Sequence, residues 1–404
     1  MGCFICKNST LFKFLDLGAQ PPSDAFLRKE DLGKSETTYP LSLCFCDVCG
    51  LVQLQDVVDP EVLFRDYVYT TGMNNSLRAN FKVLVEMLVT RFSLTKGDFV
   101  IDIGSNDGTL LSFYAPFGVR TLGVDPSSAS ALAKEKGIPT LVDFFNAQTA
   151  ARVASEYGKA KVITATNVFA HVGDIDSFMQ GLAAALREDG VFVSESGYLL
   201  DMVETLGYDA IYHEHLRYYS LRPLTILFER FGMEIFDVER IPSHNGSIRV
   251  FAGFKGIHQK VPSVGELLAL EEKYGLYDET IFIQFAKRVY AHKDALIALL
   301  AKGKKAGKRI VGIGAPAKGN TLLNFCGITP DVVDCLLEKS DLKIGLYAPG
   351  THIPVVSEAL LYTEQPDLAL LLSWNLADEL VLKLKQDGFK GEFIIPFPAP
   401  KIVH

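Results

Sequence analysis

The chain has 404 residues, a formal net charge of −8 at pH 7, and 48% hydrophobic against 22% charged residues. This length implies two to four folding units at roughly 100–200 residues each, and the composition excludes a disordered chain. The acidic balance disfavours a nucleic-acid binder, whose affinity depends on clustered Lys and Arg. No apolar run reaches the roughly 18–20 residues that span a bilayer, and the N-terminal residues lack a signal-peptide pattern. We therefore expect a cytoplasmic enzyme that binds neither nucleic acid nor membranes.

The cysteines are concentrated at the N-terminus. Cys3-x-x-Cys6 and Cys46-x-x-Cys49 form two pairs whose spacing suits one tetrahedral zinc ion, whereas an odd total of seven speaks against a disulfide framework. Four thiolates leave no open coordination position, so we expect a structural zinc that stabilises a module too short to have its own core. Cys44 lies outside the spacing and is expected to be packed. The alternative is a set of buried cysteines with accidental spacing.

Helical and strand patterns alternate through the middle of the chain. Apolar residues at helical spacing predict a helix over 75–92. Strands are then predicted at residues 99–104, 121–124, 162–165 and 191–194. This alternation predicts a doubly wound parallel sheet with its ligand at the carboxyl ends of the strands. Residues 234–240 and 247–253 predict an antiparallel pair that closes the sheet.

The last third of the chain predicts a second unit of the same class. Residues 256–308 read as helix, with a long amphipathic stretch at 281–300. A second α/β alternation starts at residue 309, with strands predicted at 332–336, 368–372 and 393–395. The fold class is therefore α/β, with two nucleotide-type units joined by helices.

A glycine-containing loop follows the strand at residues 99–104. It reads Asp102-Ile103-Gly104-Ser105-Asn106-Asp107-Gly108, and its glycines allow a sharp turn and close ligand approach. The spacing is not G-x-G-x-x-G, which disfavours a dehydrogenase. Asp125 ends the next strand, where a ribose diol would be bound, and Asn167 follows the fourth strand. The loop resembles that of class I S-adenosylmethionine-dependent methyltransferases, which makes Asp102, Gly104, Asn106, Gly108, Asp125 and Asn167 the candidate cofactor-binding residues. The alternative is a glycine-rich turn in an unrelated α/β protein.

Two further segments carry polar side chains suited to catalysis. His171 follows the fourth strand and is either an acid or base that faces the substrate or a histidine that caps the next helix. Residues 208–219 combine tyrosine, histidine and glutamate, but they lack the H-E-x-x-H spacing of a helical zinc site. This cluster would lie at the mouth of the sheet, over the substrate; the alternative is a hydrogen-bonded structural loop.

Taken together, these motifs resemble one family. The four-cysteine module, D-I-G-S-N-D-G, N-V-F-A-H-V, Y-H-E-H-L-R-Y-Y and G-A-P-A-K-G-N-T-L-L-N occur in this order. The chain resembles the nucleotide-sugar C-methyltransferases, which methylate C-3 of a 4-keto-6-deoxyhexose, over essentially its whole length. The resemblance implies a zinc-binding domain at 1–66, a methyltransferase domain at 67–255, a helical connector at 256–308 and a Rossmann-like nucleotide-sugar-binding domain at 309–404. It also implies S-adenosylmethionine and a structural zinc ion as cofactors, a deoxythymidine diphosphate sugar as substrate, with a guanosine diphosphate sugar as the alternative, and a monomer.

The resemblance also suggests catalytic roles. The carbon next to a ketone loses a proton only if the enolate is stabilised, so a base must face C-3 and donors must face the C-4 oxygen. His215 matches the family's proposed base, and the unperturbed pKa of a histidine side chain lies near neutrality. His171 and Glu214 are ranked after it; Glu214 could instead orient the imidazole or bind a sugar hydroxyl. Tyr212 and Tyr69, or its neighbour Tyr67, are candidate donors to the enolate oxygen.

In the last unit, residues 314–321 follow a predicted strand and open a helix. A helix N-terminus with a lysine suits a sugar diphosphate, which makes Lys318 and Asn320 candidate substrate-binding residues, with Lys343 and His352 from a neighbouring strand end. The P-loop spacing is absent. A domain retained only for packing is the alternative here. For the whole protein, the alternatives are a sugar O-methyltransferase and a non-catalytic nucleotide-sugar binder.

Overall fold

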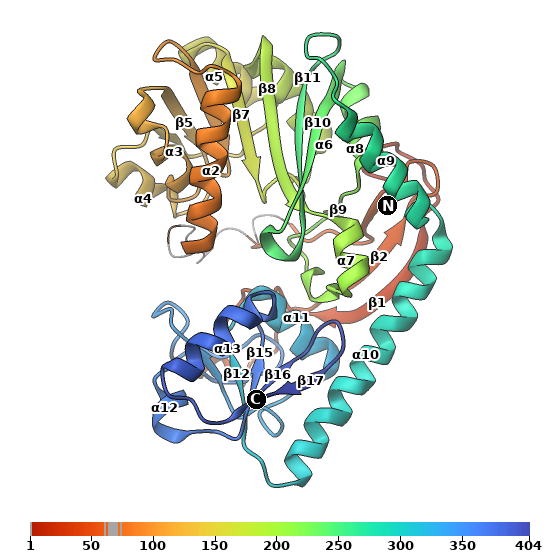
Figure 1. Ribbon diagram of the computed structural model, residues 1–404, viewed down its shortest axis with the longest axis vertical. Coiled ribbons are helices and arrows are strands. Elements are labelled where there is room, and N and C mark those ends of the chain that lie inside the picture. Colours follow the sequence, from red (N-terminus) through yellow and green to blue (C-terminus); the bar gives the residue numbers. More distant parts are fainter. Residues whose placement is uncertain (1, 60–61, 64–71, 73–74) are drawn as a thin grey trace.

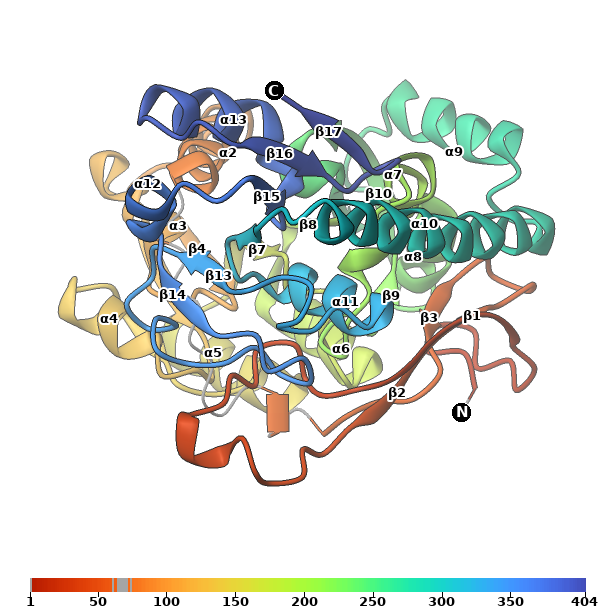
Figure 2. The same cartoon turned by 90° about the horizontal axis from the view of Figure 1, so that it is seen from below.

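The computed structural model describes residues 2–59, 62–63, 72 and 75–404. A central and a C-terminal α/β domain lie one above the other, and the N-terminal strands run along one side between them (Figure 1). The 27-residue helix α10 (Glu279–Lys305) spans the two α/β domains along that side, as the view from below also shows (Figure 2). None of the helices in the described part of the chain is long and apolar enough to cross a membrane.

The central domain is built on a seven-stranded sheet in the order β10-β11-β8-β7-β4-β5-β6. Its strands are β4 (Phe99–Ile103), β5 (Arg120–Val124), β6 (Thr140–Leu141), β7 (Ala160–Thr166), β8 (Leu186–Gly197), β10 (Met233–Ile241) and β11 (Ser247–Phe254). Neighbouring strands from β6 to β8 are parallel, whereas β11 runs antiparallel to both β8 and β10. The predicted parallel sheet and its closing antiparallel pair are confirmed, with β11 inserted between β8 and β10.

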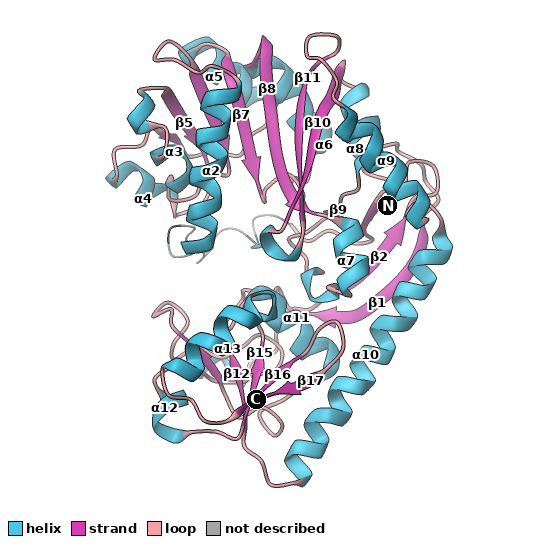
Figure 3. Cartoon of the chain, in the orientation of Figure 1, coloured by secondary structure: helices cyan, strands magenta, loops and turns pink. Residues whose placement is uncertain are grey.

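Helices cover both faces of this sheet (Figure 3). They are α2 (Asn75–Arg91), α3 (Thr109–Ser112), α4 (Ser130–Glu135), α5 (Ala147–Tyr157), α6 (Ile175–Ala185) and α8 (Leu221–Glu229), whereas α7 (Leu199–Thr205) lies beyond the strand ends, towards the C-terminal domain. β4 is buried along its whole length, as expected for a strand covered on both sides. Helix α6 starts where the Asp174 carboxylate accepts a hydrogen bond from the Ser177 amide at 3.0 Å. The interpretation of His171 as the cap of this helix is therefore wrong.

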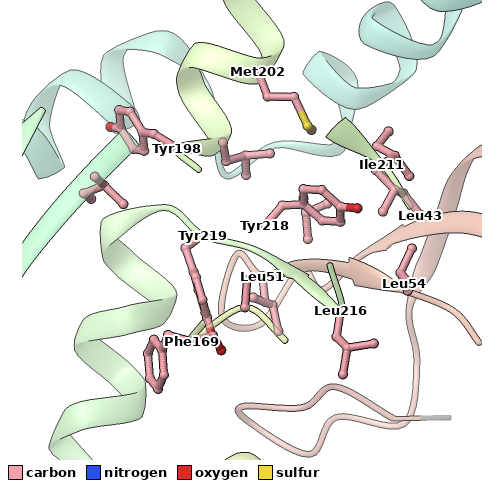
Figure 4. Close-up of a cluster of buried hydrophobic side chains, with 14 of the residues drawn as sticks. Leu43, Leu51, Leu54, Phe169, Tyr198, Met202, Ile211, Leu216, Tyr218 and Tyr219 are labelled. Atoms are coloured by element: carbon pink, nitrogen blue, oxygen red, sulfur yellow. The ribbon is translucent and has the colours of Figure 1, made fainter. Parts of the chain in front are cut away.

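The N-terminal module is a four-stranded sheet that borrows one strand from the central domain. β1 (Phe12–Gln20), β2 (Tyr39–Phe45) and β3 (Val52–Leu54) pair antiparallel, and β3 also pairs with β9 (Arg217–Tyr218). Figure 4 shows Leu43, Leu51 and Leu54 of the module among buried side chains of the central domain. The module and the central domain therefore share both a sheet and a hydrophobic core.

The C-terminal domain has a six-stranded sheet in the order β14-β13-β12-β15-β16-β17. Its elements are β12 (Ile310–Ile313), α11 (Ala317–Cys326), β13 (Leu336–Glu338), β14 (Val355–Ser357), α12 (Leu360–Glu364), β15 (Leu368–Leu371), α13 (Ala377–Gln386), β16 (Glu392–Ile395) and β17 (Lys401–Val403). The sheet is parallel except for β17. α9 (Pro262–Tyr274) and α10 join it to the central domain, as predicted.

One predicted strand is misplaced. Residues 332–336 were expected to be extended, but the strand begins at Leu336. The amides of Val332 and Val333 instead donate to the carbonyl oxygen of Thr329 at 2.9 and 3.0 Å, which makes a turn. Both valines are at least partly buried, so their apolar pattern reflects packing rather than strand structure.

Candidate active site and zinc centre

The four predicted zinc ligands come together. The Sγ atoms of Cys3, Cys6, Cys46 and Cys49 all lie within 4.8 Å of one another. A tetrahedral zinc ion with bonds of about 2.3 Å separates its sulfur ligands by about 3.8 Å, so this cluster fits zinc. Cys44 is buried outside the cluster, as predicted, with its thiol 3.8 Å from the Gln55 side-chain oxygen.

The predicted cofactor loop lies at the carboxyl ends of β4, β5 and β7. Gly104 and Gly108 both have positive φ, +67° and +74°, which favours glycine. A Cβ atom on Gly104 would overlap the Val168 side chain, so the loop packs closely against the segment that follows β7. Asn167 also has a positive φ, and its backbone N–H donates to the backbone carbonyl of Glu195 at 2.8 Å.

The carboxylates of the loop have different environments. The Asp125 carboxylate accepts a hydrogen bond from the backbone N–H of Asn106 at 2.7 Å. It also accepts from the backbone N–H and the hydroxyl of Ser127, at 2.8 and 2.5 Å. Asp102 is fully buried beneath the loop and accepts from the Thr164 hydroxyl at 2.6 Å. Burial raises the pKa of Asp102 to about 7, and the charges of Asp125 and Glu195 act in the same direction. Asp102 therefore joins β4 to β7, while Asp125 lies beside the loop backbone.

Asp107 ties the loop to the segment before α2. Its carboxylate accepts from the Gly72 amide at 3.1 Å and from the Lys136 ammonium at 3.0 Å. A Cβ on Gly72 would collide with this carboxylate, so the contact depends on glycine. Tyr67 and Tyr69, the predicted donors, lie outside the described residues.

His215 is held in a defined tautomer. Its Nδ1 lies 2.8 Å from the Ala210 carbonyl oxygen, which can only accept, so Nδ1 carries the proton. The other ring nitrogen, Nε2, is therefore the accepting nitrogen, and the Tyr212 hydroxyl, 2.8 Å away, donates to it. Residues 208–215 do not form an extended strand. η4 (Tyr208–Ala210) is a short 3-10 helix, and the turn that follows it places the Tyr212 side chain against the His215 ring.

His171 lies beside this pair, with its ring centroid 4.9 Å from that of His215. Burial lowers the pKa of His171 to about 4, and the charge of Arg217 lowers it further. Arg217 is itself fully buried, donates to the carbonyl of Val172, and stacks on Phe4 of the N-terminal module at 4.8 Å. His171 is therefore neutral at pH 7, a property that favours it as a hydrogen-bonding partner over a proton donor.

Glu214 points to a different set of partners. Its carboxyl lies 3.4 Å from the Ser23 hydroxyl, which donates to it. Burial raises the pKa of Glu214, the negative charge of Asp24 raises it further, and the Lys343 charge opposes this. Lys343 in turn donates to Asp24 at 3.3 Å and lies over the Phe26 ring at 4.7 Å. Glu214 thus accepts a hydrogen bond from the N-terminal part of the chain and interacts electrostatically with Lys343 of the C-terminal domain.

The predicted substrate-binding residues of the C-terminal domain divide into three places. Asn320 donates to the Ser23 carbonyl at 2.7 Å and so joins Lys343 on the 23–26 segment. Lys318 is the second residue of α11, where burial lowers its pKa while the negative charge of Asp209 raises it. His352 lies elsewhere, with its Nε2 hydrogen-bonded to the Glu36 carboxylate of the N-terminal module at 2.7 Å.

Comparisons with known proteins decide the family. The chain is 35% identical to the C-methyltransferase NovU of Streptomyces niveus over 410 aligned residues, which cover 99% of this chain and 96% of that protein. This chain belongs to the C-methyltransferase family. Family descriptions match a putative zinc binding domain at residues 3–64, a methyltransferase domain at 77–238 and a C-methyltransferase C-terminal domain at 242–398. The C-methyltransferase therefore has the predicted order of zinc-binding, methyltransferase and C-terminal parallel-sheet domains; the residue boundaries that we predict between them stay predictions.

Other relatives match only part of the chain. A ubiquinone biosynthesis O-methyltransferase of Methylobacterium sp. is 35% identical over 98 residues, 23% of this chain and 38% of that protein. The structure of a SAM-dependent methyltransferase from Anabaena variabilis is 17% identical in sequence. The match covers 44% of this chain and 86% of the Anabaena chain, with a TM-score of 0.36.

S-adenosylmethionine and zinc are the cofactors of this C-methyltransferase. The cysteine cluster fits zinc by its donor set, and the positive-φ glycine turn beside Asp125 fits the cofactor. Sequence reasoning missed residues that act from a distance: Ser23 and Asp24 lie about 190 residues from Glu214 and share no motif with it. It also passed over Asp209, although this residue lies within the tyrosine and histidine run that the sequence singles out.

Proposed function

We propose that this C-methyltransferase methylates C-3 of a nucleotide-linked 4-keto-6-deoxy sugar through an enolate, as a step in branched deoxysugar synthesis. The observation that supports this best is the His215 side chain, whose Nδ1 is bound to the Ala210 carbonyl so that Nε2 presents a lone pair. A methyl transfer to carbon needs such a base, since the carbon must first lose a proton.

His215 is the proposed base. The C-3–H bond breaks and its electron pair enters the enolate formed with the C-4 ketone, while its proton goes to Nε2 as the Tyr212 O–H, which donates to Nε2 beforehand, turns its hydrogen away towards the enolate oxygen. The protonated ring then donates to the Tyr212 oxygen, 2.8 Å away, while Nδ1–H stays on Ala210. His171 is a weaker base because burial keeps its pKa low. When bound, S-adenosylmethionine supplies an electrophilic methyl group carried on a positively charged sulfur.

Glu214 and Tyr212 are the proposed donors to the substrate. The raised pKa of Glu214 favours its neutral form, and a neutral carboxyl group can donate a hydrogen bond to a sugar hydroxyl or to the enolate oxygen. Tyr69, which lies outside the described residues, stays a candidate for the same role. Each well-placed donor contributes about 3–4 kcal/mol to lowering the barrier in comparable sites.

The C-terminal domain is the proposed holder of the nucleotide. Lys318 at the start of α11 and Lys343 supply positive charge for a diphosphate, and Asn320 and His352 supply polar groups. We expect deoxythymidine diphosphate as the carrier, with guanosine diphosphate as the alternative.

The first test is mass spectrometry of the enzyme with S-adenosylmethionine and a panel of nucleotide-linked sugars. The proposal expects a gain of one methyl group on 4-keto-6-deoxy sugars and none on their 4-hydroxy counterparts. Methylation of hydroxyl-only sugars would show an O-methyltransferase instead, and binding of the sugars without transfer to any of them would favour a nucleotide-sugar binder.

The base is tested by His215→Asn. Asparagine cannot take up the proton, so turnover should fall at least 100-fold, while calorimetry should show that both ligands still bind. His171→Asn serves as the comparison and should retain more activity because its ring is not the base. Unchanged turnover in His215→Asn would contradict the assignment.

A further inference from the structure

The turn that carries the Ala210 carbonyl is clamped by the C-terminal half of the chain. The Tyr208 ring packs edge-on against Phe325 and Phe397, with centroids 5.5 and 5.2 Å away. Its hydroxyl lies 3.1 Å from Nδ1 of His292, whose Nε2 donates to the Pro396 carbonyl at 2.7 Å. The first residue of η4 is thus fixed by α10, α11 and the segment after β16.

The second residue of the turn is a buried acid. Asp209 is 1% exposed, and its Oδ2 accepts from the indole Nε1–H of Trp374 at 2.6 Å. Its Oδ1 has no hydrogen-bond partner within the described part of the chain. Lys318 supplies a nearby positive charge, since it lowers the pKa of Asp209 against the effect of burial. Both partners belong to the C-terminal domain.

The third residue supplies the carbonyl that binds His215. Ala210 directly follows Asp209, and its oxygen accepts from His215 Nδ1 at 2.8 Å. A displacement of the turn would therefore move this acceptor away from the ring. The hydrogen bond of one imidazole nitrogen determines which of the two nitrogens carries the proton. Without the Ala210 acceptor, His215 is no longer held in the Nδ1–H tautomer.

We propose that Asp209 and Trp374 are positioning residues, which hold η4 so that the Ala210 carbonyl keeps the Nε2 lone pair of His215 available as the base. The C-terminal domain thereby sets the state of the base in the central domain as well as holding substrate. This role rests on the proposed function of His215.

A role in packing alone explains the contact less well. A buried carboxylate must be compensated by donors or charge, as Trp374 and Lys318 do for Asp209, whereas an apolar pair would fill the same space without that requirement. The aromatic contact of Trp374 with Phe397, at 4.8 Å, would survive without the carboxylate. The polar part of the contact therefore requires a reason other than space filling.

The test separates the hydrogen bond from the packing. Trp374→Phe keeps an aromatic ring and removes the N–H donor; Asp209→Ala removes the acceptor; Asp209→Asn keeps an acceptor oxygen for Trp374. Glu379→Gln, an exposed position on α13, is the matched control. The tautomer of His215 is read from its ring 15N shifts by NMR without substrate, with the signal assigned by its loss in His215→Asn.

We expect wild type, Glu379→Gln and Asp209→Asn to show the Nδ1–H tautomer. Trp374→Phe and Asp209→Ala should populate the Nε2–H tautomer, and their kcat should fall about 10- to 100-fold, as a displacement of ~1 Å can do, with KM for S-adenosylmethionine unchanged. The double variant should lose no more than the worse single variant, because both remove the same contact.

An unchanged His215 tautomer in a folded Trp374→Phe would overturn the proposal, as would additive losses in the double variant. The NMR readout needs no substrate. A failure of the wild type to methylate any keto sugar would therefore contradict the proposed function while leaving the coupling between Trp374 and His215 measured in its own right.

Discussion

At the scale of single residues, the environment of each carboxyl group matters more than its place in the sequence. Asp102 and Asp125 both end strands of the central sheet, yet one is fully buried against Thr164 and the other accepts from the loop amides. Burial raises the pKa of Asp102 to about 7, well above the roughly 3.9 of an aspartate in an unfolded chain. The folded protein therefore binds this proton more tightly than the unfolded chain does.

This shift predicts how stability changes with pH. The Asp102 contribution is fully present below about pH 4 and is lost as pH rises towards 7, because the unfolded chain ionises over this range while the buried group keeps its proton. Asp102→Asn cannot ionise, so its free energy of unfolding should improve relative to wild type by about 2–3 kcal/mol between pH 5 and pH 8. Denaturant unfolding at both pH values measures this difference. Asp331→Asn, at an exposed position, is the control and should show no such trend; a constant difference for Asp102→Asn would contradict the assignment.

The sequence predicts candidate residues best where they share one segment. Tyr212, Glu214 and His215 lie in one short run, and its polar side chains together with the family resemblance make them candidates. It could not show that Glu214 turns towards Ser23 whereas His215 turns towards Tyr212, because that follows from the turn geometry. Ser23 and Asp209 have partners far away in the chain, and no local pattern marks such residues.

At the scale of elements, the turn between β4 and α3 depends on glycine for two reasons. Gly104 has a φ of +67°, and a Cβ there would overlap Val168. Gly137 has a similar φ of +75° but open space around it, so it isolates the conformational contribution. The two glycines therefore have similar backbone conformations and differ in whether a neighbouring side chain would overlap an added Cβ atom.

Gly104→Ala should lower the free energy of unfolding by about 2–3 kcal/mol and weaken S-adenosylmethionine binding, since both strain and overpacking contribute. Gly137→Ala should lose about 1 kcal/mol with cofactor affinity unchanged. Adding Val168→Ala to Gly104→Ala should recover part of the loss by making room. Denaturant midpoints and calorimetric affinities measure these effects; equal losses for the two glycines would contradict the packing argument.

Long alternating segments are predictable because each strand of a parallel sheet is a nearly continuous apolar run, as β4 and β12 are. The misplaced strand at 332–336 shows where this reasoning fails. Val332 and Val333 are apolar because they pack, while their amides close a turn on Thr329. Apolar pattern reports burial, and short apolar runs do not distinguish strand from turn.

At the scale of the whole molecule, the zinc-binding module is continuous with the proposed active site. β3 pairs with β9, the Leu54 amide donates to the Leu216 carbonyl at 3.0 Å, and the Leu216 amide donates to the Ala170 carbonyl at 3.0 Å. Leu216 and Ala170 are the chain neighbours of His215 and His171. Figure 4 shows the shared core, in which Leu54 and Leu216 lie near Tyr218. Sequence analysis predicted each unit but not this joint sheet, because its fourth strand is only two residues long.

Loss of zinc should therefore reach the active site. Cys46→Ser should lower zinc content and reduce turnover at least tenfold, since small displacements of a catalytic group are costly. Hydrogen exchange should show faster exchange at Leu216 and Tyr218 as well as in the module. Cys44→Ser, at a buried cysteine outside the cluster, should keep its zinc and its protection. Unchanged exchange at 216–218 after zinc loss would show that the module folds independently of the site.

The most direct measurement is exchange of the C-3 hydrogen of a nucleotide-linked 4-keto-6-deoxy sugar in deuterated buffer. The enzyme is incubated with the sugar and S-adenosylhomocysteine, which carries no methyl group to transfer, and the sugar is examined by NMR and mass spectrometry. Formation of an enolate at His215 predicts that deuterium enters C-3 with the wild type and not with His215→Asn. Methylation of C-3 without any such exchange, or exchange at the same rate in His215→Asn, would contradict the enolate mechanism proposed for this site.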